Sequence, residues 1–222
     1  MGPRHSKYHH GDLRRMLIST AEEIITKQGL EALTLRLLSK RIGVSHSAAY
    51  RHFKSKHELL CVLALEGFRE MEARFKKIDP KQRLSPREHI SAIGKAYIEF
   101  ALENPARFRV MFGQALIGQP LPPELSQAIS DAFNSLRKAI ERGQQTGVVR
   151  AGDPVALTSV GWSMAHGISQ LLIDGQLMII KGGQAGPALM THAQSPVDQD
   201  TKQLINIALD TMTAGLMKPA GD

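Results

Sequence analysis

Polar and basic side chains gather between residues 34 and 56 at spacings that suit contact with a nucleic acid. A short helix beginning near Ser45 would hold an imidazole, a hydroxyl and a methyl group in its first turn, where base edges of the major groove are reached. The basic and hydroxyl side chains that follow suit guanine and phosphate oxygens. The preceding helix would also offer its N-terminus to an anion. The candidate contact residues are Thr34, Arg36, Ser45, His46, Ser47, Ala48, Tyr50, Arg51, His52 and Lys56.

Two short helices joined by a tight turn must position these side chains. Thr34 is the expected N-cap of the first helix, and Ser45 is the expected N-cap of the second. Gly43 supplies the positive φ that the turn needs, and Val44 would pack beneath both helices. One helix can then brace across the DNA backbone while the other enters the major groove. Residues 34–53 therefore predict a helix-turn-helix.

The charge of the chain favours the same partner. The formal net charge is +7, and the first 60 residues carry 11 Lys or Arg against 5 Asp or Glu, whereas the remaining residues carry 17 against 16. This asymmetry is typical of a nucleic-acid-binding unit attached to a nearly neutral body. A basic tail that only aids solubility is the alternative. Residues 1–10 are expected to form a flexible basic arm, which either enters the minor groove or stays disordered.

Several other classes of protein find no support. The single cysteine, Cys61, allows no internal disulfide and is expected to be a buried thiol. No stretch of 18 apolar residues and no secretory leader is found, which predicts a cytoplasmic, nucleoid-associated protein without a membrane partner. The adjacent His9 and His10 make a weak metal site, and the glycines at 182, 183 and 186 give a weak phosphate-binding signal. Without a nucleotide loop, dinucleotide fingerprint or catalytic motif, we expect neither an enzyme nor a cofactor.

Apolar residues recur at helical spacing almost throughout, which predicts an all-α fold. We expect a three-helix DNA-binding domain at 11–71 and a larger ligand-binding and dimerisation domain at 72–222. The glycine- and proline-containing stretch 175–197 is expected to be a long, mobile connection. The expected helices are 13–28 with Asp12 as its cap, 34–42, 45–53, 55–77 with Ser55 and Glu58 as a capping box, 86–103, 106–117, 123–145, 154–173 and 197–217.

The segment from Gly11 to Met71 closely resembles the TetR family of bacterial regulators. The resemblance implies a recognition helix around Ser45–His52, and it adds Leu35 to the expected DNA contacts. Two positions depart mildly from the family pattern: Ala49 replaces a larger aliphatic residue, and Ser39 stands where alanine is usual. The matching pattern is Thr34-x-Arg36-x-Leu38-Ser39-x-x-x-Gly43-Val44-Ser45-x-x-x-x-Tyr50-x-His52-Phe53-x-x-Lys56-x-x-Leu59.

The remainder of the chain resembles the C-terminal part of such regulators. The stretch Gly161–Ile168 is similar to the Trp-His-Gly signature of one TetR subgroup. The resemblance implies a ligand pocket among residues 86–175 and an intersubunit bundle built from the last two helices. Met and aromatic side chains suit an adaptable apolar pocket, although ordinary core packing is the alternative for each. The candidate pocket residues are Phe100, Phe108, Met111, Phe112, Trp162, Met164 and His166.

These features together predict a homodimeric transcriptional regulator, acting as a repressor. It would bind a palindromic operator in double-stranded DNA and be released by a small, largely apolar effector. A TetR-like adaptor or coregulator that acts through a protein partner is the alternative.

Overall fold

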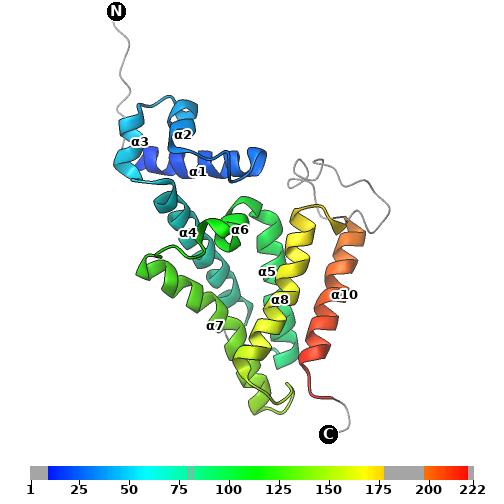
Figure 1. The fold of residues 1–222 in the computed structure, drawn as a ribbon. Coiled ribbons are helices and arrows are strands. Elements are labelled where there is room, and N and C mark those ends of the chain that lie inside the picture. Colours follow the sequence, from blue (N-terminus) through cyan, green and yellow to red (C-terminus); the bar gives the residue numbers. More distant parts are fainter. Residues whose placement is uncertain (1–9, 80, 82, 178–197, 220–222) are drawn as a thin grey trace, which may run out of the picture. The chain divides into compact units, whose positions relative to one another are not determined.

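The computed structural model describes residues 10–79, 81, 83–177 and 198–219. Residues 1–9 of the expected arm, the glycines near 183 and nearly all of the expected connection at 175–197 lie outside these residues, whereas His10, expected at the end of the arm, begins α1. Within them the regular secondary structure is helical, the helices are joined by turns and loops, and one isolated β-bridge links Val149 and Met217. The helices are α1 (His10–Gln28), α2 (Leu35–Ile42), α3 (His46–His52), α4 (Lys56–Ile78), α5 (Pro86–Glu103), α6 (Pro105–Phe112), a 3₁₀ turn (Gln114–Leu116), α7 (Pro123–Gln145), α8 (Pro154–Ile173) and α10 (Gln199–Leu216) (Figure 1).

The chain divides into two compact units. Residues 1–64 and 106–121 form the N-terminal unit, and residues 65–105 and 122–222 form the C-terminal unit. Helix α4 is continuous, so its first part belongs to one unit and its second part to the other. The all-α fold predicted from the sequence is confirmed for the described residues.

In the N-terminal unit, α1, α2 and α3 pack around a small apolar core. Leu17, Ile24, Leu38 and Ala49 are fully buried, and Phe53 is 1% exposed. Ala49 accordingly occupies an interior position of the α2–α3 packing. Burial of this apolar surface is what holds helices this short in place, because an isolated helix of seven or eight residues is unstable in water.

Residues 106–121 also pack with the N-terminal unit, which the sequence pattern did not indicate. Arg107 on α6 forms an ion pair with Glu22 on α1. The backbone carbonyl of Pro120 lies 3.1 Å from the Nε2 atom of His57, at the start of α4. These contacts between residues far apart in the sequence hold the segment against α1 and α4.

Two predicted helix starts differ in detail from the structure. Helix α1 begins at His10, one turn earlier than expected, so Asp12 lies inside the helix and is not its N-cap. At the start of α4 the Ser55 hydroxyl accepts from the Glu58 N–H at 3.1 Å, as expected. The Glu58 carboxylate, however, accepts from the N–H of Lys54 at 2.6 Å and not from that of Ser55, so the reciprocal bond of a capping box is shifted by one residue.

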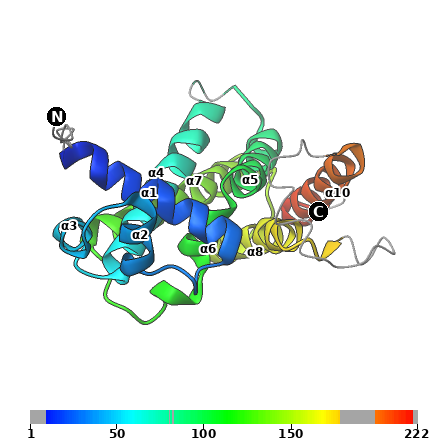
Figure 2. The same cartoon turned by 90° about the horizontal axis from the view of Figure 1, so that it is seen from above.

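In the C-terminal unit, α5 is the central helix and packs against α7, α8 and α10 (Figure 2). Its Ile90, Ile98 and Phe100 side chains are fully buried. A Cβ atom at Gly94 would lie 2.8 Å from the Leu209 side chain and 3.0 Å from that of Met212, so glycine allows α10 to approach α5 closely. This bundle encloses the interior cavity described below.

Candidate nucleic-acid interface and ligand cavity

The two short helices are fixed by local hydrogen bonds. The Thr34 hydroxyl accepts from the Leu37 N–H at 3.0 Å, and the Ser45 hydroxyl accepts from the Ala48 N–H at 3.3 Å. Gly43 ends α2 with φ at 77°, and its N–H donates to the Ser39 carbonyl. The predicted caps and turn are therefore confirmed. Each bond satisfies an end group that the helix itself leaves unpaired.

This arrangement leaves most of the predicted contact residues on the surface. Neither α2 nor α3 contains a carboxylate, so the exposed arginines of this face meet no local negative charge on these helices. Tyr50 is 47% exposed, and its ring centre lies 5.3 Å from that of His46. The exposed members are Thr34, Arg36, Ser45, His46, Ser47, Tyr50 and Arg51, and the half-buried members are Ala48, His52 and Lys56. We call this set the α2–α3 face.

Two of the predicted contact residues make interior contacts. Leu35 is buried as part of the apolar side of α2, and Lys56 donates through Nζ to the Leu30 carbonyl at 2.8 Å. Lys56 thereby fastens the loop between α1 and α2 to the start of α4. Ser39, where the family pattern has alanine, is buried but donates its hydroxyl to the Leu35 carbonyl at 2.8 Å. The departure is tolerated because the hydroxyl has a partner inside its own helix.

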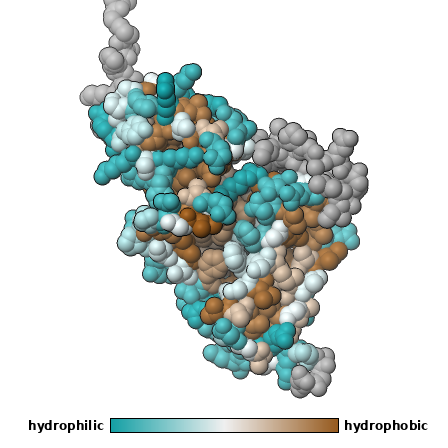
Figure 3. All heavy atoms as spheres, viewed as in Figure 1, coloured by the Kyte–Doolittle hydropathy of each residue, from teal (hydrophilic) through white to brown (hydrophobic). Residues whose placement is uncertain are grey.

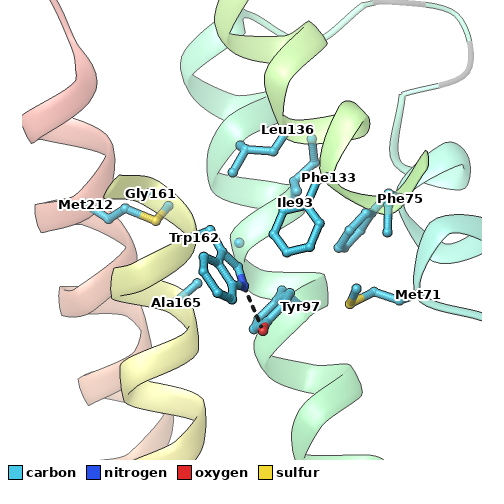
Figure 4. Close-up of a pocket in the computed structure, with 12 residues that line it drawn as sticks. Met71, Phe75, Ile93, Tyr97, Phe133, Leu136, Gly161, Trp162, Ala165 and Met212 are labelled. Atoms are coloured by element: carbon cyan, nitrogen blue, oxygen red, sulfur yellow. Dashed lines mark hydrogen bonds between the residues drawn. The ribbon is translucent and has the colours of Figure 1, made fainter. Parts of the chain in front are cut away.

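A cavity of about 30 Å³ lies inside the C-terminal unit (Figure 4). This volume suits about one or two water molecules, so a larger ligand must displace side chains. The walls are almost entirely apolar and include two flexible methionines. The lining residues are Met71, Phe75, Ile93, Gly94, Tyr97, Ala132, Phe133, Leu136, Gly161, Trp162, Ala165 and Met212.

Three side chains at this cavity are linked by hydrogen bonds that join α5 to α8. Trp162 donates through Nε1 to the Tyr97 hydroxyl at 3.1 Å, and the Tyr97 hydroxyl lies 2.8 Å from Nδ1 of His166. Because the indole can only donate, the tyrosine proton is available to His166, whose Nδ1 then accepts. Burial raises the pKa of Tyr97 and lowers that of His166, so both side chains stay neutral near pH 7. The Trp162 ring also packs edge-on against Phe133, with centroids 5.1 Å apart.

The structure brings only one of the predicted pocket residues, Trp162, to the cavity lining. His166 reaches it indirectly through Tyr97, whereas Met164 is 40% exposed on α8. Phe100 is fully buried beneath the Arg74 guanidinium. The other three predicted residues belong to the N-terminal unit, where the Phe108 and Phe112 rings pack together and Met111 is buried.

Sequence reasoning missed most of the true lining. Met71 and Phe75 are four residues apart on α4, and Ile93 and Tyr97 are four apart on α5. This spacing places each pair on one helix face. The same spacing occurs throughout the core, however, and only the packing of separate helices leaves space between these pairs.

The described residues give little support for a membrane-spanning helix, a metal site or a reactive thiol. No helix there is long and apolar enough to cross a bilayer, and no cluster of three or more His, Cys, Asp or Glu residues could hold a metal ion. Cys61 is 3% exposed, and burial followed by the nearby Glu58 charge raises the pKa of its thiol. This environment disfavours the reactive thiolate.

Comparison with known proteins extends the description. Residues 17–61 match the model of bacterial regulatory proteins of the tetR family, and residues 90–194 match that of tetracyclin repressor-like C-terminal domains. The HTH-type transcriptional regulator Rv1816 of Mycobacterium tuberculosis is 26% identical over 142 residues, covering 63% of this chain and 61% of the relative. The nucleoid occlusion factor SlmA of Aliivibrio fischeri is 33% identical over 109 residues, covering 46% and 52% respectively.

The aligned region spans about three fifths of the length of the mycobacterial relative. A solved structure of a protein without an assigned function from Rhodococcus sp. RHA1 covers 96% of this chain and 100% of its own, with a TM-score of 0.74 and 26% identity. Two family models, one for each end of the chain, and a fold shared over nearly its whole length agree. The chain belongs to the TetR family of helix-turn-helix regulators.

Proposed function

We propose that the protein is a ligand-responsive transcriptional regulator that binds palindromic operator DNA as a homodimer. The observation that carries this proposal is the α2–α3 face, where Arg36, Tyr50 and Arg51 are exposed on two capped helices that contain no carboxylate. Side chains in the first turn of α3 read bases, while Thr34 and the arginines contact phosphates and guanine.

Dimerisation through α8 and α10 would provide the twofold symmetry that a palindrome requires. Val160, Met164 and Leu171 repeat at helical spacing on α8 and are 54%, 40% and 37% exposed, and Ile207 on α10 is 54% exposed. Figure 3 shows hydrophobic residues reaching the surface of the unit that carries these helices. An exposed apolar stripe of this kind is typical of a surface buried by a partner.

The cavity next to Trp162 is the proposed effector site. Its apolar lining selects a ligand body without charge, and Met71 and Met212 are the flexible side chains able to make room. An effector that binds one arrangement of the dimer more tightly shifts the population away from the DNA-binding form. This mode of action corresponds to repression relieved by the effector.

The test is a fluorescence-anisotropy titration of the purified chain against duplexes from the DNA flanking its own gene. We expect tight binding to a palindromic duplex that weakens steeply with added salt, because phosphate contacts release counterions. Arg51→Ala should weaken binding roughly tenfold or more. Lys95→Ala, which removes an exposed lysine from α5, should leave binding unchanged. Salt-insensitive binding, or none with or without candidate effectors, would overturn the proposal.

An adaptor that acts through a protein partner is the second candidate. It is favoured by the similarity to relatives named as nucleoid occlusion factors. A protein captured by this chain at high salt and after nuclease treatment, with no palindrome-dependent DNA binding, would favour the adaptor over the regulator.

A further inference from the structure

A second hollow lies in the C-terminal unit, and its chemistry differs from that of the cavity. It is a groove of about 580 Å³ formed by α4, the segment after it, α5 and α7. Its walls are mostly polar, with charges of both signs. The lining residues are Glu72, Phe75, Lys76, Asp79, His89, Ile93, Asp131, Asn134, Ser135, Lys138, Ala139, Arg142 and Gln145.

The groove and the cavity share a wall. Phe75 and Ile93 line both hollows, and both side chains are nearly buried. Figure 4 shows both side chains among those that line the cavity, with Phe75 next to Met71. A molecule long enough to pass between them would therefore have one end among apolar side chains and the other among polar ones.

Most charges in the groove already have partners. The Asp79 carboxylate accepts from the Arg83 and Leu84 N–H groups at 2.7 and 3.3 Å and from Arg142 at 3.3 Å. Arg142 donates further to the Leu84 carbonyl at 2.8 Å. This cluster leaves little unbalanced charge in that part of the lining.

The two remaining acids of the lining have different partners. Glu72 pairs with Lys76 at 2.6 Å. Asp131 accepts from the Gln127 amide at 2.9 Å, and its negative charge also acts on Lys76. Lys138 is exposed, and no ion pair or hydrogen bond involves its ammonium among the described residues. The groove lining thus holds three carboxylates and three cations, and Lys138 is the cation that makes no ion pair or hydrogen bond among the described residues.

His89 adds a second unsatisfied group. Its Nδ1 atom is buried and has no hydrogen-bond partner among the described residues. Leaving such an atom unpaired costs free energy, which a polar ligand that enters the groove far enough to reach this atom would recover. A neutral imidazole can donate from Nδ1 to an oxygen atom of a ligand.

We propose that the effector is an amphipathic carboxylate, with its apolar chain in the cavity beside Trp162 and its carboxylate in the groove at Lys138 and His89. The chain would enter by displacing the Phe75 side chain. The carboxylate would take a charge-assisted hydrogen bond from the lysine and a second bond from the imidazole. This inference rests on the proposed effector site and defines the chemical class of its ligand.

The test uses the full chain and the emission of Trp162, which is the only tryptophan in the sequence and lines the cavity. Decanoate is titrated against methyl decanoate, which has the same chain without the charge, both below the concentrations at which they aggregate. We expect decanoate to bind roughly tenfold more tightly than the ester, the effect of a hydrogen bond to a charged group.

Lys138→Gln should abolish the preference for decanoate and leave binding of the ester unchanged. His89→Phe should reduce the preference. Lys95→Gln changes another exposed lysine, on α5 and outside the groove; it is the matched control and should keep the preference. Ala132→Met, which fills the cavity, should weaken both ligands together.

Equal binding of acid and ester, a preference that survives Lys138→Gln, or failure of decanoate to bind would overturn this inference. None of these outcomes affects the operator titration, which tests the proposed regulator separately. Conversely, loss of operator binding with an intact Lys138-dependent preference would overturn the regulator and support the ligand class.

Discussion

The α2–α3 face and the cavity hold their side chains by different means. On the face, Thr34 and Ser45 each accept a hydrogen bond from an amide three residues further along the chain. In the cavity, Tyr97 meets Trp162 and His166 across 65 and 69 residues of sequence. A surface that reads a partner can thus be specified locally, whereas an interior site depends on several helices arriving together.

The difference predicts how far the effect of a substitution spreads. On the face, an exposed side chain such as that of Arg51 can be changed without disturbing the core beneath it. In the cavity, Tyr97 on α5 is hydrogen-bonded to two residues of α8, so a change on α5 removes a partner from α8. Free energies of unfolding and local probes can test this contrast.

The largest effect on stability is expected in the apolar core beneath the α2–α3 face. Phe53→Ala removes a fully buried ring at the end of α3, which also packs against the Arg14 guanidinium. We expect a loss of about 3–5 kcal/mol in the free energy of unfolding and loss of operator binding. Urea unfolding followed by circular dichroism measures the first effect. Arg51→Ala should weaken operator binding with stability unchanged; a loss of stability equal to that of Phe53→Ala would show that the face is not separable from its core.

A single hydroxyl should matter much more in the cavity than on the face. Tyr97→Phe leaves Trp162 Nε1 and His166 Nδ1 without their shared partner, at a cost of about 1–3 kcal/mol. The matched change Tyr50→Phe removes an exposed hydroxyl and should cost less than about 0.5 kcal/mol. Unfolding followed through Trp162 emission measures both. Equal costs would contradict the contrast between the two regions.

The same contrast explains what could be predicted from the sequence. Two capped helices and a turn could be predicted from Thr34, Gly43 and Ser45, because the role of each residue depends on neighbours within a few positions. The structure confirms these caps and the turn. The all-α fold follows from helical periodicity for the same reason. The exact end of a helix is harder to predict: α1 begins at His10, one turn earlier than expected, because several nearby groups can serve as the partner of a helix end.

The cavity lining could not be predicted in this way. Met71 and Phe75 differ in no local respect from ordinary core residues, and Phe108 looked equally suitable although it packs in the other unit. The groove depends on Lys138 and His89, which lie on different helices. They stand out only because the other charged residues of the groove pair with one another, and sequence spacing does not show which side chains form those pairs.

A smaller effect with a defined pH dependence is expected at Asp79. Burial alone would raise the pKa of this carboxyl, but hydrogen bonds from Arg83, Leu84 and Arg142 bring its pKa below the ordinary value. The ionised form therefore stabilises the fold above a pH of about 4, and this contribution is lost as the pH falls through the lowered pKa. Asp79→Asn should lower the melting temperature at pH 7 and have little effect near pH 2.

Glu99→Gln, which removes an exposed carboxylate on α5, should show almost no difference at either pH. A constant deficit of Asp79→Asn at every pH would mean that the side chain acts through packing and not through its charge.

The smallest effect tests how local the α2–α3 face is. Thr34→Ala removes the acceptor for the Leu37 N–H and should cost about 1 kcal/mol, whereas Thr34→Ser retains the acceptor and should restore most of the loss. Because the bond spans three residues, faster amide hydrogen exchange should be confined to the first turn of α2. By contrast, Tyr97→Phe should accelerate exchange on both α5 and α8, since the lost bonds join those helices. If exchange after Thr34→Ala also rose across α3, the two caps would form one cooperative unit. The positions of the side chains on the α2–α3 face would then depend on both helices together and not on each helix alone.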